Sequence, residues 1–190
     1  LRTLVVVPTL LTGVRDLREQ IERLEVHFLS GTGGDIAFAL LADGVDAASE
    51  VVDGDAELLG IAAAEIARLT ARHGEGASGP RFLFLHRRRL FNASEGVWMG
   101  WERKRGKLHE LNRLLRGATD TSFAGTDGSV PSVPAGVRYV ITLDADTRLP
   151  RDTANRLIAK MAHPLNRPRW SPSAQRVVGG HAILQPRVTA

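Results

Sequence analysis

Short apolar runs alternate with amphipathic helical stripes along the 190-residue chain, and this alternation constrains the fold more than any other feature. Residues 3–8, 36–42, 81–86 and 138–143 are apolar runs of strand length, rich in β-branched and aromatic side chains. We expect Pro8 to end the first of these strands, because proline cannot donate to a sheet ladder.

Helical periodicity fills the intervals between these runs. Residues 14–29 carry apolar side chains at helical spacing with charges between them. A second helix is expected to be capped by Asp55, a third to cover residues 107–117, and a fourth to cover 152–161 with Asp152 as its cap. Strands and helices in this order predict crossover connections and therefore a mostly parallel sheet with helices on both faces, an α/β fold.

The rest of the chain is less regular. Residues 118–136 are rich in Gly, Ser, Thr and Pro, which predicts a loop, and residues 177–186 predict a fifth strand. The chain opens on a core strand and ends just past a strand-like run. We therefore expect one domain, residues 1–190, that is an excised and truncated piece of a longer protein.

Composition excludes several classes of protein. Hydrophobic residues make up 43% of the chain and charged residues 24%, as in an ordinary globular domain, so wholesale disorder is not expected. The absence of cysteine excludes a disulfide framework and any thiolate metal site or nucleophile. The apolar runs are too short to cross a bilayer, and no signal peptide is visible.

The net charge of +4 raises the question of a nucleic-acid partner. Acids are frequent in residues 1–80, whereas residues 81–116 gather arginines and lysines. A local basic cluster on a mixed surface suits a small phosphate-bearing ligand at least as well as a nucleic-acid backbone. We therefore expect no nucleic-acid partner.

Polar and acidic residues collect where the expected strands end. In open parallel sheets, ligands lie beyond the carboxyl ends of the strands, so these residues should line a site. The residues at these ends are Pro8 and Thr9, Asp43 and Gly44, His86 and Arg87, and Asp144 and Asp146.

Asp144 and Asp146 form a D-x-D pattern after the fourth strand. On an extended segment they would point to opposite faces, but where the chain turns both can reach one cation. Two such oxygen donors suit Mg²⁺ or Mn²⁺, which would neutralise a diphosphate leaving group. The alternative is that Asp146 or Thr147 only caps a turn.

A second candidate is the cluster of Arg103, Lys104, Arg105 and Lys107 around Gly106, just before the third expected helix. A glycine among cations at a helix N-terminus can receive a phosphate. Cations are disfavoured at that end of a helix, so four of them need a compensating reason, and an anionic ligand is one. The alternative is a solvated basic helix start.

Other nucleotide and hydrolase motifs are absent from the sequence. No G-x-G-x-x-G follows the first strand, which argues against a dinucleotide-binding domain. No G-x-S-x-G is present, so there is no hydrolase elbow. Asp43 could accept hydrogen bonds from a base or ribose, or could simply form a turn with Gly44.

Taken in order, "VVPTLL", the aspartate ending the second strand, "RGKLHELNRLL" and "ITLDADTRLP" resemble the nucleotide-sugar half of a GT-A glycosyltransferase. More narrowly, the chain resembles the glycosyltransferase domain of cyclic β-1,2-glucan synthases. The stretches "MGWERKRGKLHELNRLLRGATDTSF", "VRYVITLDADTRLPR", "MAHPLNRPR" and "AILQPRV" carry this resemblance, which spans nearly the entire chain.

The resemblance implies a donor site for UDP-glucose. Pro8 and Thr9 would line the uridine pocket, and Asp43 would bind the uracil. Lys107 with Gly106 and Arg105 would lie by the uridine and diphosphate. Asp144 would contact the ribose or the metal shell, and Asp146 would ligate Mg²⁺ or Mn²⁺.

The family implies inverting transfer of glucose from UDP-glucose to a growing β-1,2-glucan. Such a transfer needs a general base on the acceptor hydroxyl, which is expected beyond residue 190. The implied partners are the glucan acceptor and the rest of the synthase chain, with its transmembrane part. The implied location is the cytoplasmic face of the bacterial inner membrane.

Two rivals remain at this stage. A phosphatase of the haloacid-dehalogenase type also places D-x-D after an apolar strand, but it generally has Thr or Val where this chain has Arg148, and its motif follows the first strand. A non-catalytic module that binds a nucleotide sugar or another anion is the rival from a different class. Detectable donor hydrolysis would argue against that module.

Overall fold

The computed structural model describes residues 1–31, 33–125 and 127–186 of the chain, so residue 126 of the expected loop 118–136 lies outside it. The helical elements are α1 (Val14–Ser30), α2 (Asp55–His73), α3 (Arg103–Leu114), α4 (Thr153–Ala162) and the short 3₁₀ helix η1 (Pro164–Asn166). The strands are β1 (Thr3–Leu11), β2 (Ile36–Gly44), β3 (Phe82–Arg87), β4 (Leu90–Asn92), β5 (Val97–Met99), β6 (Phe123–Ala124), β7 (Tyr139–Thr142), β8 (Arg169–Ser171) and β9 (Arg176–Gly179).

A five-stranded sheet in the order β6-β3-β2-β1-β7 forms the centre of the molecule. β1 pairs in parallel with both β2 and β7, and β2 pairs in parallel with β3. Only the two-residue β6 is antiparallel, along the end of β3. The predicted α/β class with a mostly parallel sheet is confirmed.

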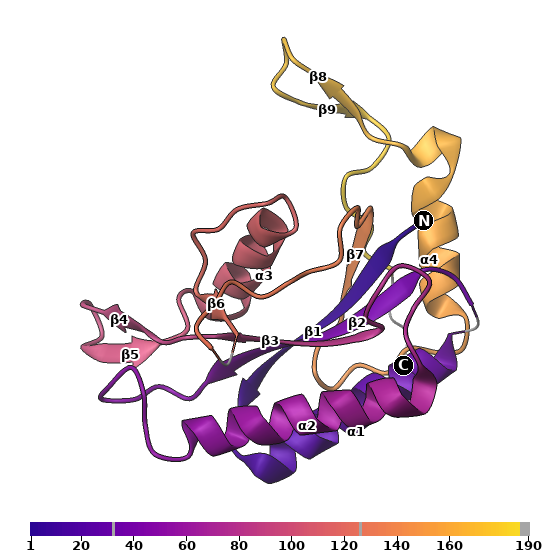
Figure 1. Ribbon diagram of the computed structural model, residues 1–190. Coiled ribbons are helices and arrows are strands. Elements are labelled where there is room, and N and C mark those ends of the chain that lie inside the picture. The colour runs from indigo at the N-terminus through magenta and orange to yellow at the C-terminus, as the bar shows by residue number, and fades with distance from the viewer. Residues whose placement is uncertain (32, 126, 187–190) are drawn as a thin grey trace.

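Helices pack on both faces of this sheet, as expected. One core lies between the sheet and α1, α2 and α4, and it includes Leu17, Leu24, Leu69 and Ala154. The other core lies under α3 and is closed by Leu111 and other leucines of that helix. Figure 1 shows α1 and α2 side by side below the sheet and α3 above it.

β1 continues through Pro8 to Leu11, so the prediction that Pro8 ends this strand is wrong. The carbonyl of Val6 accepts a hydrogen bond from Leu143, which places Val6 toward β7. The backbone nitrogen of Pro8, two residues later, faces the same side of β1. The pairing of β1 with β7 ends at Val6, so no residue of β7 pairs with Pro8. Pro8 therefore has no ladder donor to lose at this position.

Three further expectations need correction. α3 begins at Arg103 and not at residue 107, so Gly106 lies inside its first turn. Asp55 is the first residue of α2, which has Gly54 as its cap. Residues 177–186 add no strand to the sheet, because only Arg176–Gly179 is extended, and it pairs with β8 in a separate hairpin.

The fifth strand of the sheet is instead β6, which lies within the expected loop 118–136. Asp152 does precede α4, with a left-handed φ of 59° and without a side-chain capping hydrogen bond. Across the described residues, no helix combines the length and the apolar composition that a bilayer crossing requires.

Candidate functional site at the carboxyl ends of β1, β2 and β7

The first two turns of α3 lie over the carboxyl ends of the central strands. The ammonium of Lys107, only 3% exposed, donates hydrogen bonds to the carbonyl oxygens of Thr9 on β1 (2.5 Å) and Leu41 on β2 (3.1 Å). It also forms an ion pair of 3.1 Å with the Asp43 carboxylate. The structure therefore brings three of the predicted site residues, Thr9, Asp43 and Lys107, into direct contact.

Arg87 at the end of β3 anchors this cluster from below. Its fully buried guanidinium donates to both oxygens of Asp43, at 2.8 and 2.9 Å, and to Glu110 of α3 at 3.0 Å. The remaining donors reach the carbonyl oxygens of Trp101 and Arg103. Two buried cations and two buried carboxylates thus form a neutral network, the condition under which charges are stable away from water.

Burial, hydrogen bonds and neighbouring charges shift the pKa values of Lys107 and Glu110 in this network. Burial lowers the pKa of Lys107, although the neighbouring Asp43 carboxylate raises it in part. Burial alone would raise the pKa of Glu110. The hydrogen bonds that Glu110 accepts from Ser122, Thr121 and Arg87 outweigh burial, so its pKa falls below the usual value and the group stays ionised.

The other cations of α3 are paired with carboxylates of the same chain. Arg103 forms a two-pronged ion pair with Asp46 at 2.6 and 2.7 Å, and Arg105 pairs with Glu102 at 2.7 Å. Lys104 bonds to Asp144 in the loop after β7. These carboxylates therefore offset the positive charge at the N-terminus of α3, a role that we expected an anionic ligand to fill.

Gly106 has a packing role that the sequence does not reveal. A Cβ at this position would overlap the carbonyl oxygen of Trp101 and approach the Trp101 ring carbon Cε3 to 2.6 Å. Gly106 therefore lets the helix start lie against the preceding backbone, and it is buried. Arg105, by contrast, has 74% of its side chain exposed and points away from the Lys107 cluster toward Glu102.

Asp144 and Asp146 lie on a tight turn after β7, closed by a hydrogen bond of 2.9 Å from the N–H of Thr147 to the carbonyl of Asp144. Both side chains are exposed. Asp144 already holds one cation, the ammonium of Lys104. Exposed carboxylate oxygens are of the type that suits a hard divalent cation with water and phosphate oxygens as its other ligands.

The protein groups alone do not enclose a metal. Among the described residues, no three His, Asp or Glu side chains are grouped closely enough to hold a metal ion. A cation bound by Asp144 and Asp146 would therefore depend on ligands from solvent or substrate.

Two cavities lie near the ends of β1 and β2. One of about 270 Å³ is bordered by Gly44, His86, Arg89 and the starts of α1 and α2. Burial lowers the pKa of His86 to about 4, so its imidazole is neutral at physiological pH. Of the strand-end residues predicted to line a site, Gly44 and His86 border this cavity, whereas the residues predicted to bind the donor do not.

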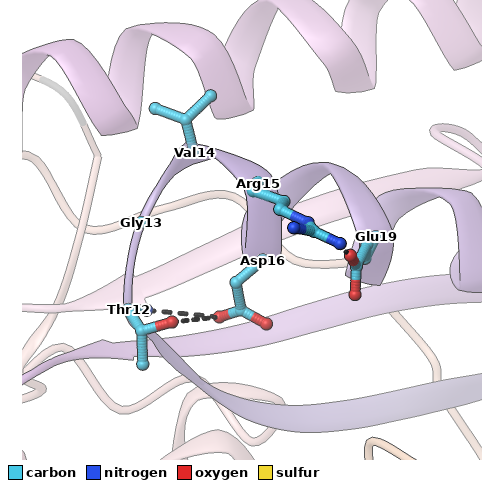
Figure 2. Close-up of a pocket in the computed structure, with 6 residues that line it drawn as sticks. All are labelled: Thr12, Gly13, Val14, Arg15, Asp16 and Glu19. Atoms are coloured by element: carbon cyan, nitrogen blue, oxygen red, sulfur yellow. Dashed lines mark hydrogen bonds and ion pairs between the residues drawn. The ribbon is translucent and has the colours of Figure 1, made fainter.

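The second, shallower cavity surrounds the start of α1, as Figure 2 shows. Its charged groups are satisfied locally. Asp16 accepts hydrogen bonds from the backbone and hydroxyl of Thr12, and Arg15 pairs with Glu19. This cavity is a weaker candidate than the Lys107 cluster, because no predicted site residue is among those that line it.

Sequence reasoning missed Glu110, and it placed Arg87 at a strand end without giving this arginine a role in the site. Arg87 stands directly opposite Asp43 in the register of β2 and β3. An aspartate and an arginine that end adjacent parallel strands are a signal that could have identified this pair. Glu110 follows Lys107 by three residues on α3, which places both on the same helix face.

Comparison with known proteins identifies a relative of this chain. No protein-family model matches the chain. The chain is 54% identical over 188 residues, 99% of its length, to the cyclic β-(1,2)-glucan synthase NdvB of Rhizobium meliloti (strain 1021), and it spans 6% of that protein. The resemblance predicted from the sequence is therefore confirmed: the chain is homologous to a segment of a cyclic β-(1,2)-glucan synthase.

Proposed function

We propose that this chain is the nucleotide-sugar-binding part of a GT-A glycosyltransferase domain that transfers glucose from UDP-glucose to a growing β-1,2-glucan with inversion. The observation that carries the proposal is the position of α3. Lys107 joins the ends of β1 and β2, and Lys104 reaches Asp144 after β7. The strand order reverses between β1 and β7, and a parallel sheet binds ligands at such a point.

Pro8, Thr9 and Asp43 are proposed to contact the uridine. The Asp43 carboxylate is held by Arg87 and Lys107, which both contact its Oδ2. Among the described residues, its Oδ1 accepts from Arg87 alone and retains a lone pair that can accept an N–H of the base. Lys107 and Gly106 would set the position of α3 beside the diphosphate. Arg105 would have to leave Glu102 to contribute a charge there.

Asp144 and Asp146 are proposed to hold Mg²⁺ or Mn²⁺. When bound, the cation would neutralise the charge that develops on the departing UDP. The ion pair between Lys104 and Asp144 is mostly exposed and therefore weak, so a divalent cation can displace the ammonium from the carboxylate. Lys104 would then be available to a phosphate oxygen.

The proposed partners beyond the donor are the β-1,2-glucan acceptor and the rest of a longer synthase chain, including a transmembrane part. The proposed location is the cytoplasmic face of the bacterial inner membrane. An inverting transfer requires a general base at the acceptor hydroxyl, and we assign none among the described residues.

Calorimetric titration of UDP-glucose and UDP into this chain, with Mn²⁺, with Mg²⁺ and with EDTA, tests the donor site. We expect binding that requires the metal and is lost in Asp146→Asn. The matched control is Asp127→Asn, which neutralises another exposed aspartate, one that bonds only within its own loop. Metal-independent binding, or equal loss in both variants, would contradict the metal site.

Release of glucose from UDP-glucose separates the enzyme from a non-catalytic binding module. We expect slow, metal-dependent hydrolysis of the donor that Asp146→Asn abolishes. Tight donor binding without any hydrolysis would favour the module. Hydrolysis of simple phosphate esters without donor binding would favour the phosphatase.

A further inference from the structure

We propose that the segment from α4 to β9, residues 153–179, is a surface that binds anionic lipid bilayers peripherally. This inference is independent of the proposed glycosyl transfer. It starts from the distribution of charge, since these 27 residues contain five arginines and lysines and no Asp or Glu. The chain as a whole has a net charge of +4, so this segment carries +5 and the rest of the chain carries −1.

The cations of this segment have no carboxylate partners among the described residues, in contrast to the cations of the first turn of α3. Around the candidate site, every arginine and lysine of the first turn of α3 is in an ion pair. Among the described residues, none of the five cations of residues 153–179 is in one, and all five are exposed. They are Arg156, Lys160, Arg167, Arg169 and Arg176.

Large apolar side chains are exposed among these cations. Leu165 on η1 is 82% exposed, Trp170 on β8 is 59% exposed and Val178 on β9 is 56% exposed. An isolated exposed leucine needs no explanation, but three apolar residues in a short, purely basic segment form a specific combination. Tryptophan has an apolar ring and a polar N–H, which suits the boundary between headgroups and acyl chains.

The arrangement of the elements exposes this segment. α4 packs its apolar side, including Ala154 and Ile158, into the core beside β7. Arg156 and Lys160, four residues apart on one helix face, stay in solvent. In Figure 1, the β8–β9 hairpin projects well beyond the sheet and the other helices. A planar surface could therefore meet the hairpin without colliding with the other described elements.

The chemistry favours a bilayer over other anionic partners. A nucleic acid would use the five charges but would gain little from Leu165 and Val178, which offer no base-stacking ring. An anionic bilayer would interact with both kinds of side chain, because basic side chains bind its headgroups and apolar side chains enter the boundary between headgroups and acyl chains. Neither part needs a membrane-spanning helix.

Sedimentation of the chain with vesicles tests the proposal. The vesicles are made of phosphatidylglycerol and phosphatidylcholine in equal parts, or of phosphatidylcholine alone. We expect binding only to the anionic vesicles, and release at high salt. The triple variant Arg167→Gln, Arg169→Gln, Arg176→Gln should bind on the order of a hundredfold more weakly. Trp170→Ala should bind about tenfold more weakly.

The matched control is the triple variant Arg15→Gln, Arg18→Gln, Arg72→Gln. It changes the net charge equally, at exposed positions on α1 and α2. We expect it to bind vesicles like the unchanged protein. Equal weakening in both triple variants would overturn the proposal in favour of a long-range charge effect.

Trp170→Ala tests the lipid part of the inference separately. If it binds anionic vesicles like the unchanged protein while duplex DNA competes with them, the surface is a general polyanion site and the bilayer proposal fails. Absence of binding to anionic vesicles by the folded, unchanged chain would also overturn it. Near-ultraviolet circular dichroism confirms that each variant is folded.

Discussion

Arg87 is the residue on which the buried charge network depends. Its side chain is fully buried, and its removal would leave the carboxylates of Asp43 and Glu110 without their strongest partner. We expect Arg87→Met to lower the free energy of unfolding by about 3–5 kcal/mol, because uncompensated buried charge costs that much. Urea unfolding followed by circular dichroism measures the change.

The neighbouring Arg88 provides the control for that prediction. It is exposed, and only its backbone is bonded, through a hydrogen bond to Ser122. Arg88→Met should change the free energy of unfolding by less than about 0.5 kcal/mol. Similar urea midpoints for the two variants would show that the network does not stabilise the fold.

Two helical glycines should respond in opposite ways to alanine. Gly60 in α2 has open space where a Cβ would be, whereas a Cβ on Gly106 would overlap Trp101. Gly60→Ala should therefore raise the free energy of unfolding by about 0.5–1 kcal/mol, and Gly106→Ala should lower it despite the better helix propensity. Thermal unfolding of the two variants gives the signs, and a stabilising Gly106→Ala would contradict the described packing.

The residues of the candidate site show how much of a site can be predicted from a sequence. Asp43, Thr9 and Lys107 were predictable because parallel strands and family motifs identify the ends of strands. Glu110 was missed and Arg87 was given no role, because their importance depends on burial, which arises from the packing of α3 over β3. The pairing of Lys104 with Asp144 joins residues 40 apart, and no local pattern predicts such a contact.

At the scale of elements, the two outlying hairpins should differ in their effect on stability. No residue of β8 or β9 is buried, so replacing residues 168–179 with a short Gly-Ser linker should change the free energy of unfolding by less than about 0.5 kcal/mol. In the β4–β5 hairpin, Met99 is buried and Trp98 pairs with Ala47.

Replacing residues 90–99 by the same linker should therefore cost about 2 kcal/mol or more. Urea unfolding of both linker variants measures the difference. Equal and large losses would show that the β8–β9 hairpin packs against the body of the protein.

Length decided which elements could be predicted. The nine-residue strands β1 and β2 and the long helices α1 and α2 show clear periods, and their predicted bounds lie within a few residues of the observed ones. β6 has two residues and β4 and β5 have three each, too few to establish a period of two. The start of α3 was placed too late because the sequence Arg103–Gly106 is charged, without an apolar stripe.

At the scale of the whole molecule, the buried His27 and the partly buried His86 couple stability to pH. Burial lowers the pKa of His86 from 6.5 to about 4. The carboxylates of Asp43 and Asp55 act to raise this pKa, and the cations Arg89 and Lys107 act to lower it further. Burial and the nearby Arg23 also lower the pKa of His27. Both side chains are therefore neutral in the folded protein under conditions where the unfolded chain protonates them.

Since the unfolded state binds more protons below pH 6.5, acidification favours unfolding. The contribution of His86 is absent above pH 6.5, and it removes up to about 3 kcal/mol of stability as the pH falls toward 4. Urea unfolding of the unchanged protein at a series of pH values across this window should show a steady loss. His86→Gln should flatten that dependence, whereas His163→Gln, at an exposed site on the edge of η1, should leave it as it was. If His86→Gln kept the full pH dependence, the acid sensitivity would have to come from other groups, and His86 would not be the neutral, partly buried group that the fold indicates.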